Sequence, residues 1–476
     1  MVDGNDVQGG DGTARGCGQR WGVALAVLLV VGSLDSTAHA NTYTVTTTAG
    51  SGVGSLRRAI SDANANPGVD SIAFNIPGAS PHVIAPTSAL PQLTDPVVID
   101  GTTQPGYSGA PLVVLDGSGV ANVRGLEILA ADCDVRGLVI HSWRVGVEVA
   151  ASGATVEACW IGIDASGVVA RSNRNGVRVL AAGVFARIAD CVVSGNVEEA
   201  IELQSSDGVV EGCTIGLDPA RAIALPNADG IVINAGAARN VVRSNHVAAN
   251  PGSNVLIDEF TTTDNSVVDN VLGFDGNRVF TFSSTHGILV RDADSALVQG
   301  NLIAASGSAG IRVEATRASS TGARLNRLAN NRFGVFSSSY RMIDIAAPGL
   351  DSNDPLDADT GANERQNRPD LHLAISAGSV VFLAGSLHSV PLTTFDVEFF
   401  ASENPYAETI LLANHVFTTD ANGDATFALL FPGLPTGSTI YSTATDPLGN
   451  TSEVGDVYVR TLGNKRRPFR PPYSKN

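Results

Sequence analysis

Short phrases of alternating apolar and polar positions recur through the middle of the chain. Each copy has a small residue followed by an apolar, a variable and an apolar position, reading GVEV, GVRV, AIEL, GIVI, NVLI, GILV, GIRV and GVFS from Gly146, Gly176, Ala200, Gly230, Asn254, Gly287, Gly310 and Gly334. Successive copies start 23 or 24 positions apart, or 30 to 33 where a copy is lengthened, so one unit is 24 residues. A unit of this length is too short for a helix pair, and the alternation has a period of two. The pattern therefore predicts a parallel β-helix, in which three short strands per coil advance the chain by one strand spacing, about 4.8 Å.

A second recurring position supports the same fold. Six segments that follow the strands place a Cys or an Asn at one equivalent position, with a branched apolar residue two positions later: Cys159, Cys191, Cys213, Asn245, Asn270 and Asn301. We expect these side chains to face inward and to stack on like residues of neighbouring coils. The same geometry puts Val177, Ile201 and Ile231 in a single interior file.

The two ends of the repeat differ from its middle. Near the start, Leu56, Ala59, Ile60 and Ala63 recur at helical spacing and predict a short amphipathic helix that covers the open end of the coils. After residue 368, seven short apolar segments with turn signals between them predict a small immunoglobulin-like β-sandwich. The predicted divisions are a signal peptide (1–40), a cap with irregular first coils (41–120), a regular β-helix (121–347), an acidic linker (348–368), the β-sandwich (369–461) and a basic, disordered tail (462–476).

The start of the chain, up to Ala40, indicates export. The apolar run WGVALAVLLVVGSL at 21–34 is followed by AHA at 38–40, which is typical of a signal peptide cleaved before Asn41. Nothing later approaches the roughly 20 apolar residues of a membrane span. We therefore expect a bacterial protein that is secreted or held at the cell surface, with no transmembrane segment after cleavage.

The net charge bears on which partners the protein can bind, and the cysteine positions bear on whether the cysteines form disulfides. The net charge of −17 argues against nucleic acid as a partner, because phosphates would be repelled. In an exported protein cysteine pairing must be considered. The spacing of about 4.8 Å between Cys159, Cys191 and Cys213 lies inside the permitted disulfide range, but parallel side chains are poorly aimed for it. Buried free thiols are the favoured interpretation, with disulfides as the alternative.

Four segments resemble a known family. They are GSLRRAISDANANPG (54–68), VVIDGTTQPGY (97–107), the Ile/Leu-Gly-x-Asp loops at Gly162, Gly216 and Gly273, and DADTGAN (357–363). Together they resemble the extracellular right-handed parallel β-helix proteins of bacteria that begin with a GSLR-containing cap, over essentially the whole chain after the signal peptide. The resemblance implies the fold and says little about function, because members are largely assigned by architecture. Family members often carry Asn where this chain has Cys159, Cys191 and Cys213.

The acidic linker is the best candidate for a metal site. It holds Asp351, Asp354, Asp357 and Asp359 close to Gly361. Ca²⁺ prefers six to eight oxygen ligands, and a D-x-D-x-G run lets carboxylates wrap the ion while Gly makes the turn. A solvated acidic hinge is the alternative, because the segment lacks the bidentate Glu of a full EF-hand loop.

The outward side of the repeated strands carries the candidate catalytic residues. Glu199, Glu202 and Asp229 can cluster across neighbouring coils, and paired carboxylates are what glycoside hydrolysis needs. A lyase would instead need a base near a metal-bound uronate. The structural alternative is a ladder of cross-strand ion pairs, with Arg178 above Glu202 and with Asp258, Arg291 and Glu314 alternating in sign.

Sugar binding without catalysis requires fewer residues than an active site does. Trp160 has outward parity and Trp143 lies one coil away, so the two rings can form a platform for sugar, with packing under a loop as the alternative. A protein of this charge should repel polyuronates unless Ca²⁺ bridges them. We therefore favour an exported, adhesin-like scaffold that binds a polysaccharide or a partner surface through Trp143, Trp160 and Arg178. The alternative is a polysaccharide lyase or glycoside hydrolase that uses Glu199, Glu202 and Asp229.

Overall fold

The computed structural model describes residues 40–278, 284–304, 307–316, 322–334, 341–346, 348–404 and 407–461. The predicted signal peptide, apart from Ala40, and the predicted basic tail lie outside these residues.

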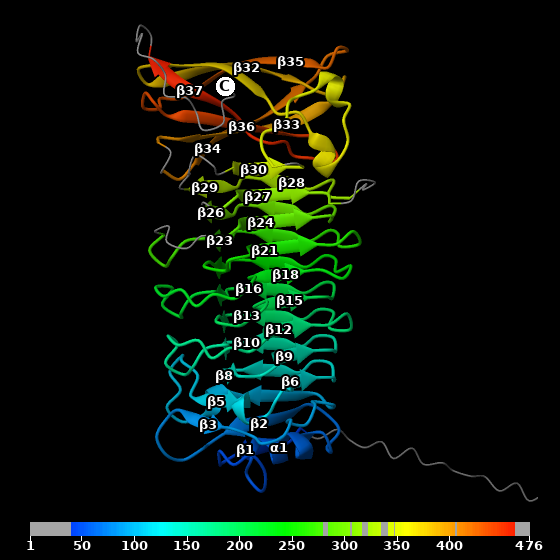
Figure 1. The fold of residues 1–476 in the computed structure, drawn as a ribbon, viewed down its shortest axis with the longest axis vertical. Coiled ribbons are helices and arrows are strands. Elements are labelled where there is room, and N and C mark those ends of the chain that lie inside the picture. Colours follow the sequence, from blue (N-terminus) through cyan, green and yellow to red (C-terminus); the bar gives the residue numbers. More distant parts are fainter. Residues whose placement is uncertain are drawn as a thin grey trace, which may run out of the picture. The chain divides into compact units, whose positions relative to one another are not determined.

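Three parallel sheets form a β-helix, in which each regular coil adds one strand to each sheet. Figure 1 shows the successive strands of one sheet above one another. Sheet A consists of β1 (Thr42–Val45), β2 (Asp70–Phe74), β4 (Val97–Asp100), β7 (Asp134–Arg136), β10 (Thr155–Glu157), β13 (Arg187–Ala189), β16 (Val209–Glu211), β19 (Val241–Arg243), β22 (Ser266–Val268), β25 (Leu297–Gln299) and β28 (Arg327–Ala329). Sheet B consists of β3 (His82–Ile84), β5 (Val113–Asp116), β8 (Leu138–His141), β11 (Trp160–Ile161), β14 (Val192–Val193), β17 (Thr214–Ile215), β20 (His246–Val247), β23 (Val271–Leu272), β26 (Leu302–Ala304) and β29 (Arg332–Gly334). Sheet C consists of β6 (Arg124–Ile128), β9 (Val145–Val149), β12 (Asn175–Val179), β15 (Ile201–Leu203), β18 (Ile231–Ile233), β21 (Ser253–Asp258), β24 (His286–Arg291), β27 (Ala309–Glu314) and β30 (Arg341–Ile345).

The predicted interior file is confirmed. Val177 pairs with Ile201 and Ile201 with Ile231, in parallel register, and all three side chains are fully buried. Because a parallel register puts each residue over its counterpart one coil away, the apolar positions of every coil enter one continuous core.

The predicted Cys and Asn column is also confirmed, at the bend between sheets A and B. The residue before each member has a left-handed backbone, as at Asp269 with φ 55° and Gly300 with φ 69°, so the chain turns in a single step. Asn270 Oδ1 accepts a hydrogen bond from the Asn245 amide at 2.9 Å, and Asn270 Nδ2 donates to the carbonyl of Val242 at 2.9 Å. The column therefore pairs polar groups inside the core that would otherwise lack partners.

The structure adds a second asparagine ladder that the sequence analysis did not identify. At the bend between sheets B and C, Asn173, Asn196 and Asn227 each donate from Nδ2 to the side-chain oxygen of the next member, at 2.9 to 3.0 Å, and the ladder ends at Asn250. It was missed because the bends before it contain the long loops, which vary the spacing between its members.

The cysteines in the column are buried free thiols, as the favoured interpretation predicted. Cys191 Sγ donates to the carbonyl of Val156 at 3.5 Å, just as Asn245 Nδ2 donates to the carbonyl of Val210. A thiol therefore replaces the amide as donor where the chain has Cys, but it supplies no carbonyl oxygen for the neighbouring coil.

The eighth copy of the repeated phrase was wrongly placed at Gly334. Gly334 ends β29 of sheet B, where it pairs with Ala304, and the corresponding strand of sheet C is β30, in which Ile343 pairs with Ile311. The rest of that phrase, residues 335–337, lies outside the described residues. A Gly followed by an apolar residue fits any short strand, so the phrase alone does not distinguish the sheets.

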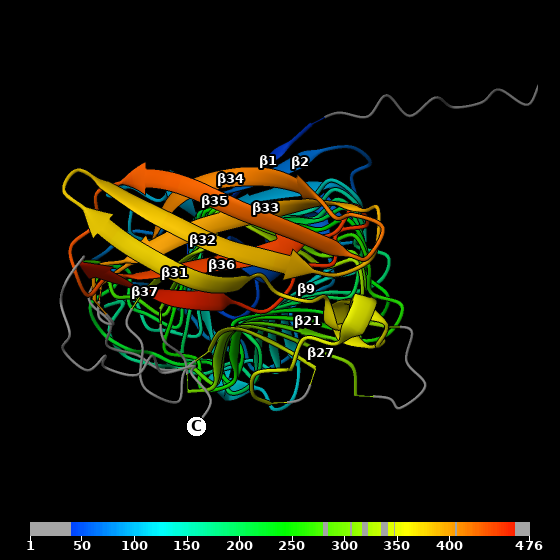
Figure 2. The same ribbon diagram turned by 90° about the horizontal axis from the view of Figure 1, so that it is seen from above.

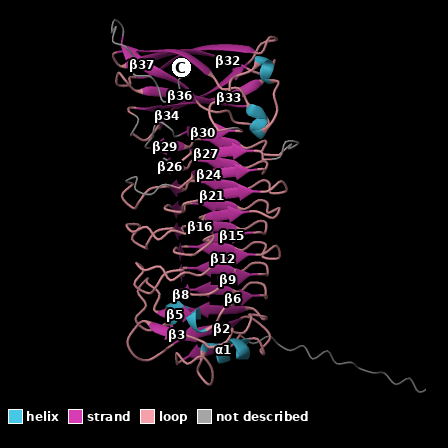
Figure 3. Cartoon of the chain, in the orientation of Figure 1, coloured by secondary structure: helices cyan, strands magenta, loops and turns pink. Residues whose placement is uncertain are grey.

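The predicted N-terminal helix is α1 (Leu56–Ala63), which packs on β1 and β2 (Figure 3). Leu56, Ala59, Ile60 and Ala63 are its buried residues, and Ser55 caps its N-terminus by accepting from the Arg58 amide. The short 3₁₀ helices are η1 (Gly101–Thr103), η2 (Gly117–Gly119), η3 (Pro355–Asp357) and η4 (Ala362–Arg365).

The C-terminal strands form the predicted β-sandwich (Figure 2). They are β31 (Asp370–Ala377), β32 (Val380–His388), β33 (Thr394–Ser402), β34 (Ile410–Thr418), β35 (Asp424–Pro432), β36 (Thr439–Thr445) and β37 (Gly455–Thr461). One layer has the order β31-β32-β35 and the other β34-β33-β36-β37, and a parallel pairing of β31 with β37 links them. Phe395, Phe399 and Phe427 fill the space between the layers.

Side chains of the sandwich pair with the open edge of the last coil. They accept hydrogen bonds from its backbone amides: Asn450 from Leu325, Thr451 from Leu328, Glu398 from Asn330, Thr409 from Phe333 and Glu453 from Ile345. An open strand edge exposes unpaired N–H groups, and these contacts satisfy several of them without adding another strand.

Candidate functional site

The outer face of sheet C brings the predicted catalytic residues onto neighbouring strands. Arg178 lies opposite Glu202, and Arg178 Nε is 2.8 Å from Glu202 Oε2. Glu202 Oε1 also accepts from Gln204 at 2.8 Å and from Asn234 at 3.2 Å. Both oxygens of this carboxylate are therefore already used within the sheet.

Glu199 and Asp229 are likewise held by neighbours. Glu199 accepts a hydrogen bond from Asn175 Nδ2, and Asp229 Oδ1 accepts from the Ser253 amide at 2.6 Å. Burial raises the pKa of Glu199, and the nearby carboxylates of Glu202 and Asp229 add to the effect. The three predicted residues lie in one region, where each stabilises the strand beside it.

The rest of this face follows the ion-pair interpretation. Arg291 forms a bidentate pair with Asp258, at 2.9 and 2.5 Å, in adjacent coils. Three apolar side chains on the same outward face, Val232, Leu256 and Leu289, lie above one another and are buried. The side chains of this face are consequently either paired with an opposite charge or packed against other apolar side chains.

The predicted pair of stacking tryptophans is not formed. Trp143 is only 3% exposed, and its indole N–H donates to the carbonyl of Leu115 at 3.1 Å. It follows β8 in a bend, where strand alternation no longer applies, and it fills the space left by Gly117 and Gly125. Trp160 is partly buried against Ile163, Val192 and Leu225 and therefore supports the loop that begins at Gly162.

A groove of about 620 Å³ opens on the outer side of sheet B, over β3, β5 and β8. Pro81, Val83 and Val114 give it an apolar side, and Val83 pairs with Val114 across neighbouring strands. The polar lining residues are Asp116, Ser118, His141, Ser142, Asp164, Ser166 and Arg171. A concave surface that combines an apolar area with a few converging polar groups is the usual form of a ligand site.

Asp116 and His141 lie side by side on β5 and β8. His141 Nδ1 is 3.0 Å from Ser142 Oγ and 3.6 Å from Asp116 Oδ1. A Ser-His-Asp triad needs the serine and the carboxylate on different ring nitrogens, so this arrangement does not activate Ser142 as a nucleophile. Burial lowers the pKa of His141, with Asp116 opposing the shift, which leaves the imidazole neutral at pH 7.

The remaining charged groups of the groove come from the loop at 162–171. The loop is a short hairpin, in which Ile163 pairs with Ala170 and the Arg171 amide donates to the Gly162 carbonyl. Asp164 Oδ1 accepts from the amide and the hydroxyl of Ser166, at 3.1 and 2.6 Å, which fixes the turn. The sequence analysis identified this loop by its Gly-x-Asp motif but did not assign Asp164 or Arg171 to a site.

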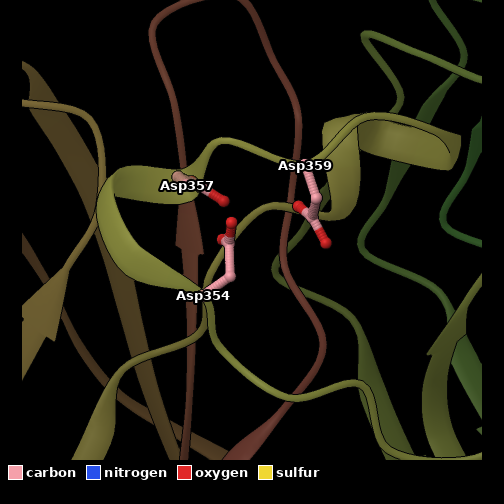
Figure 4. Close-up of side chains that lie close together, drawn as sticks. All are labelled: Asp354, Asp357 and Asp359. Carbon is pink, nitrogen blue, oxygen red and sulfur yellow. The ribbon is translucent and has the colours of Figure 1, made fainter.

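The acidic linker brings three of its four predicted ligands together (Figure 4). One carboxylate oxygen from each of Asp354, Asp357 and Asp359 lies within 4.8 Å of the others. Asp354 Oδ1 and Asp359 Oδ1 are buried without a hydrogen-bond partner, so a cation would fit between them. Burial raises the pKa of Asp357 to about 6, and its oxygens accept from Asn367 and Ser389. Asp351 lies outside this cluster.

Comparisons with known proteins concern the fold. The model of a right-handed β-helix region matches residues 145–282. Among solved structures, the Dettilon tailspike protein is similar at 14% identity and a TM-score of 0.40, covering 80% of this chain and 90% of the tailspike. The tailspike protein 2 enzymatically active domain of bacteriophage CBA120 gives 8% identity and 0.43, covering 84% and 73%. An alginate lyase from a Paenibacillus species gives 17% and 0.38, covering 64% and 94%.

No curated protein matches the chain. Among the described residues, no helix has the length and hydropathy needed to cross a membrane. The comparisons identify residues 145–282 as a right-handed β-helix region and agree with the parallel strand order of the sheets.

Proposed function

We propose that this chain is an exported β-helix scaffold that binds carbohydrate in the groove over β3, β5 and β8. The proposal rests on one observation, that apolar Val83 and Val114 share a concave surface with Asp116, His141 and Arg171. A sugar ring offers the matching combination, since its C–H face is apolar and its hydroxyls both donate and accept hydrogen bonds. The groove replaces the tryptophan pair as the proposed ligand contact.

Export and a location outside the cell rest on the sequence of residues 21–40. The test is the mass of the mature protein recovered from the producing cells. Cleavage before Asn41 supports export, and a protein that stays inside the cell with the segment before Asn41 still attached contradicts it.

Calcium binding by Asp354, Asp357 and Asp359 is part of the proposal. The buried oxygens of Asp354 and Asp359 that lack partners support it, because a bound cation would neutralise three neighbouring carboxylates. These residues would hold the ion, which would supply positive charge between the β-helix and the sandwich.

The alternative function is a polysaccharide lyase or glycoside hydrolase on the outer face of sheet C. One observation favours it, the raised pKa of Glu199, because a general acid must hold its proton near neutral pH. The test is release of reducing ends or of unsaturated uronates from a polysaccharide panel, with and without Ca²⁺. Activity that is lost in Glu199→Gln, Glu202→Gln and Asp229→Asn would support the enzyme, and no activity on any polymer would count against it.

The proposed binding is tested with a glycan array and the protein from Asn41 onward. Arg171→Ala should weaken binding of the selected glycan by about tenfold or more, because hydrogen bonds to charged groups contribute about 1.5–3 kcal/mol. The matched control is Arg174→Ala, which removes an exposed arginine paired with Glu198 outside the groove lining. If no glycan binds, or if the two variants behave alike, the groove is not the carbohydrate site.

A further inference from the structure

We infer that the groove selects neutral, hydroxyl-rich glycans and rejects polyuronates. This inference deepens the proposed carbohydrate binding and rests on it. It comes from the balance and placement of charge in the groove, which the whole-chain charge of −17 does not by itself determine.

The groove carries more negative than positive charge. β5 contributes Asp116, and the loop at 162–171 contributes Asp164 and Arg171. The titratable group from β8 is His141, which is buried and neutral at pH 7 because burial lowers its pKa. Two carboxylates therefore face one guanidinium, and a ligand with a carboxylate on every ring meets net repulsion.

Both carboxylates present a similar hydrogen-bonding group to a ligand. Asp116 Oδ1 accepts from the Ser118 amide at 2.9 Å, and Asp164 Oδ1 accepts from Ser166. Their Oδ2 atoms form no hydrogen bond among the described residues and can accept from sugar hydroxyls. A hydroxyl donates to such an oxygen, whereas an ionised uronate carboxylate only accepts and cannot.

Arg171 completes the pattern as a donor. It has no salt bridge among the described residues, so its guanidinium can donate to the oxygens of a hydroxyl-rich ligand. One donor beside two acceptors suits successive hydroxyls along a chain of sugars. The carboxylate of a uronate can pair with only Arg171 among these three groups, and it is repelled by Asp116 and Asp164.

The test is a substitution that changes the charge and keeps the turns. Asp116→Asn with Asp164→Asn removes two negative charges, while each Asn retains the oxygen that accepts from Ser118 or Ser166. Asp275→Asn is the matched control, because Asp275 makes the same turn, accepting from the Asn277 amide at 2.9 Å, outside the groove lining.

Binding is measured for dextran and laminarin as neutral glycans and for polygalacturonate and alginate as polyuronates, in chelator and at low salt. The wild-type protein should bind a neutral glycan at least tenfold more tightly than either polyuronate. The double variant should bind the neutral glycan more weakly and gain polyuronate binding that disappears at high salt, whereas Asp275→Asn should match the wild type.

Tight binding of a polyuronate by the wild type in chelator, lost in Arg171→Ala, would overturn the inference and leave the proposed carbohydrate binding intact. A double variant that gains no polyuronate binding would also overturn it. If the wild type binds no glycan of either class, the inference and the proposed function fail together.

Discussion

Glu453 Oε1 accepts a hydrogen bond from the backbone amide of Ile345 at 3.1 Å, and thereby joins the sandwich to the last strand of sheet C. Its other oxygen accepts from the Asp351 amide at 2.9 Å. Burial raises the pKa of Glu453 from 4.5 to about 7, with Asp344 and Asp351 adding to the shift and the two amides opposing it.

Because the pKa of Glu453 is raised, we predict that the folded protein is more stable in mild acid than in mild base. Between pH 4.5 and about 7 the folded protein keeps a proton that the unfolded chain has lost, so the free energy of unfolding falls as the pH rises through this window. The contribution is on the order of 3 kcal/mol, because each pKa unit corresponds to about 1.4 kcal/mol. The melting temperature should therefore be higher at pH 5 than at pH 8.

Glu453→Gln provides the control, because it removes the titration and keeps one acceptor oxygen. The variant should show a smaller difference between the two pH values. Burial also raises the pKa of Asp456, to about 6, so part of the pH dependence of the melting temperature should remain in the variant. A wild-type melting temperature that is unchanged or higher at pH 8 would contradict the assignment.

The asparagine column predicts a large effect of Asn270→Ala. The substitution removes the acceptor of the Asn245 amide and one of the two acceptors of Asn245 Nδ2, which keeps the Val210 carbonyl. It also removes the Asn270 donor to the Val242 carbonyl, and all of these groups lie inside the core. Each buried group left unpaired costs about 1–3 kcal/mol, so the loss should exceed about 2 kcal/mol. Thermal unfolding measures it, and Cys213→Ala, which removes a weaker donor from the same column, should cost less. Equal losses would show that volume rather than hydrogen bonding governs the column.

The ion pair between Arg178 and Glu202 predicts a coupled pair of substitutions. Arg178→Leu leaves a mostly buried carboxylate without its cation and should destabilise the fold by about 1–3 kcal/mol. Adding Glu202→Val extends the apolar file of Val232, Leu256 and Leu289, so the double variant should recover most of the loss. Glycan binding should be unchanged throughout. A double variant less stable than the sum of the single effects would contradict the structural role of the pair.

Calcium addition should raise the melting temperature of the wild-type protein, and a chelator should reverse the change. A ligand that binds only the folded state contributes about 2.7 kcal/mol at a hundred times its Kd. Asp354→Asn with Asp359→Asn should abolish the response, because it removes the two oxygens that lack partners. The matched control is Asp420→Asn, an exposed turn carboxylate in the sandwich. A response that persists in the double variant would place any calcium site elsewhere.

The sequence predicts the fold well because its pattern is periodic. The file through Val177 and Ile201 follows from spacing alone, since each coil repeats one local solution. Trp143 was misplaced because it lies in a bend, where its orientation depends on the space left by Gly117 and Gly125. The groove combines residues from an irregular early coil, such as Val83, with a loop residue, Asp164, and no period relates the two.

The stacking of equivalent coils also fixes the distance between features at different heights of the β-helix. Along sheet B, seven strand spacings separate β8, which carries His141 of the groove, from β29, whose Phe333 amide binds Thr409 of the sandwich. At about 4.8 Å each, they amount to roughly 34 Å. Insertion or deletion of one complete coil between them would change that separation by one strand spacing and leave the residues at both ends unchanged. The distance from the groove to the sandwich is therefore set by the number of coils between them.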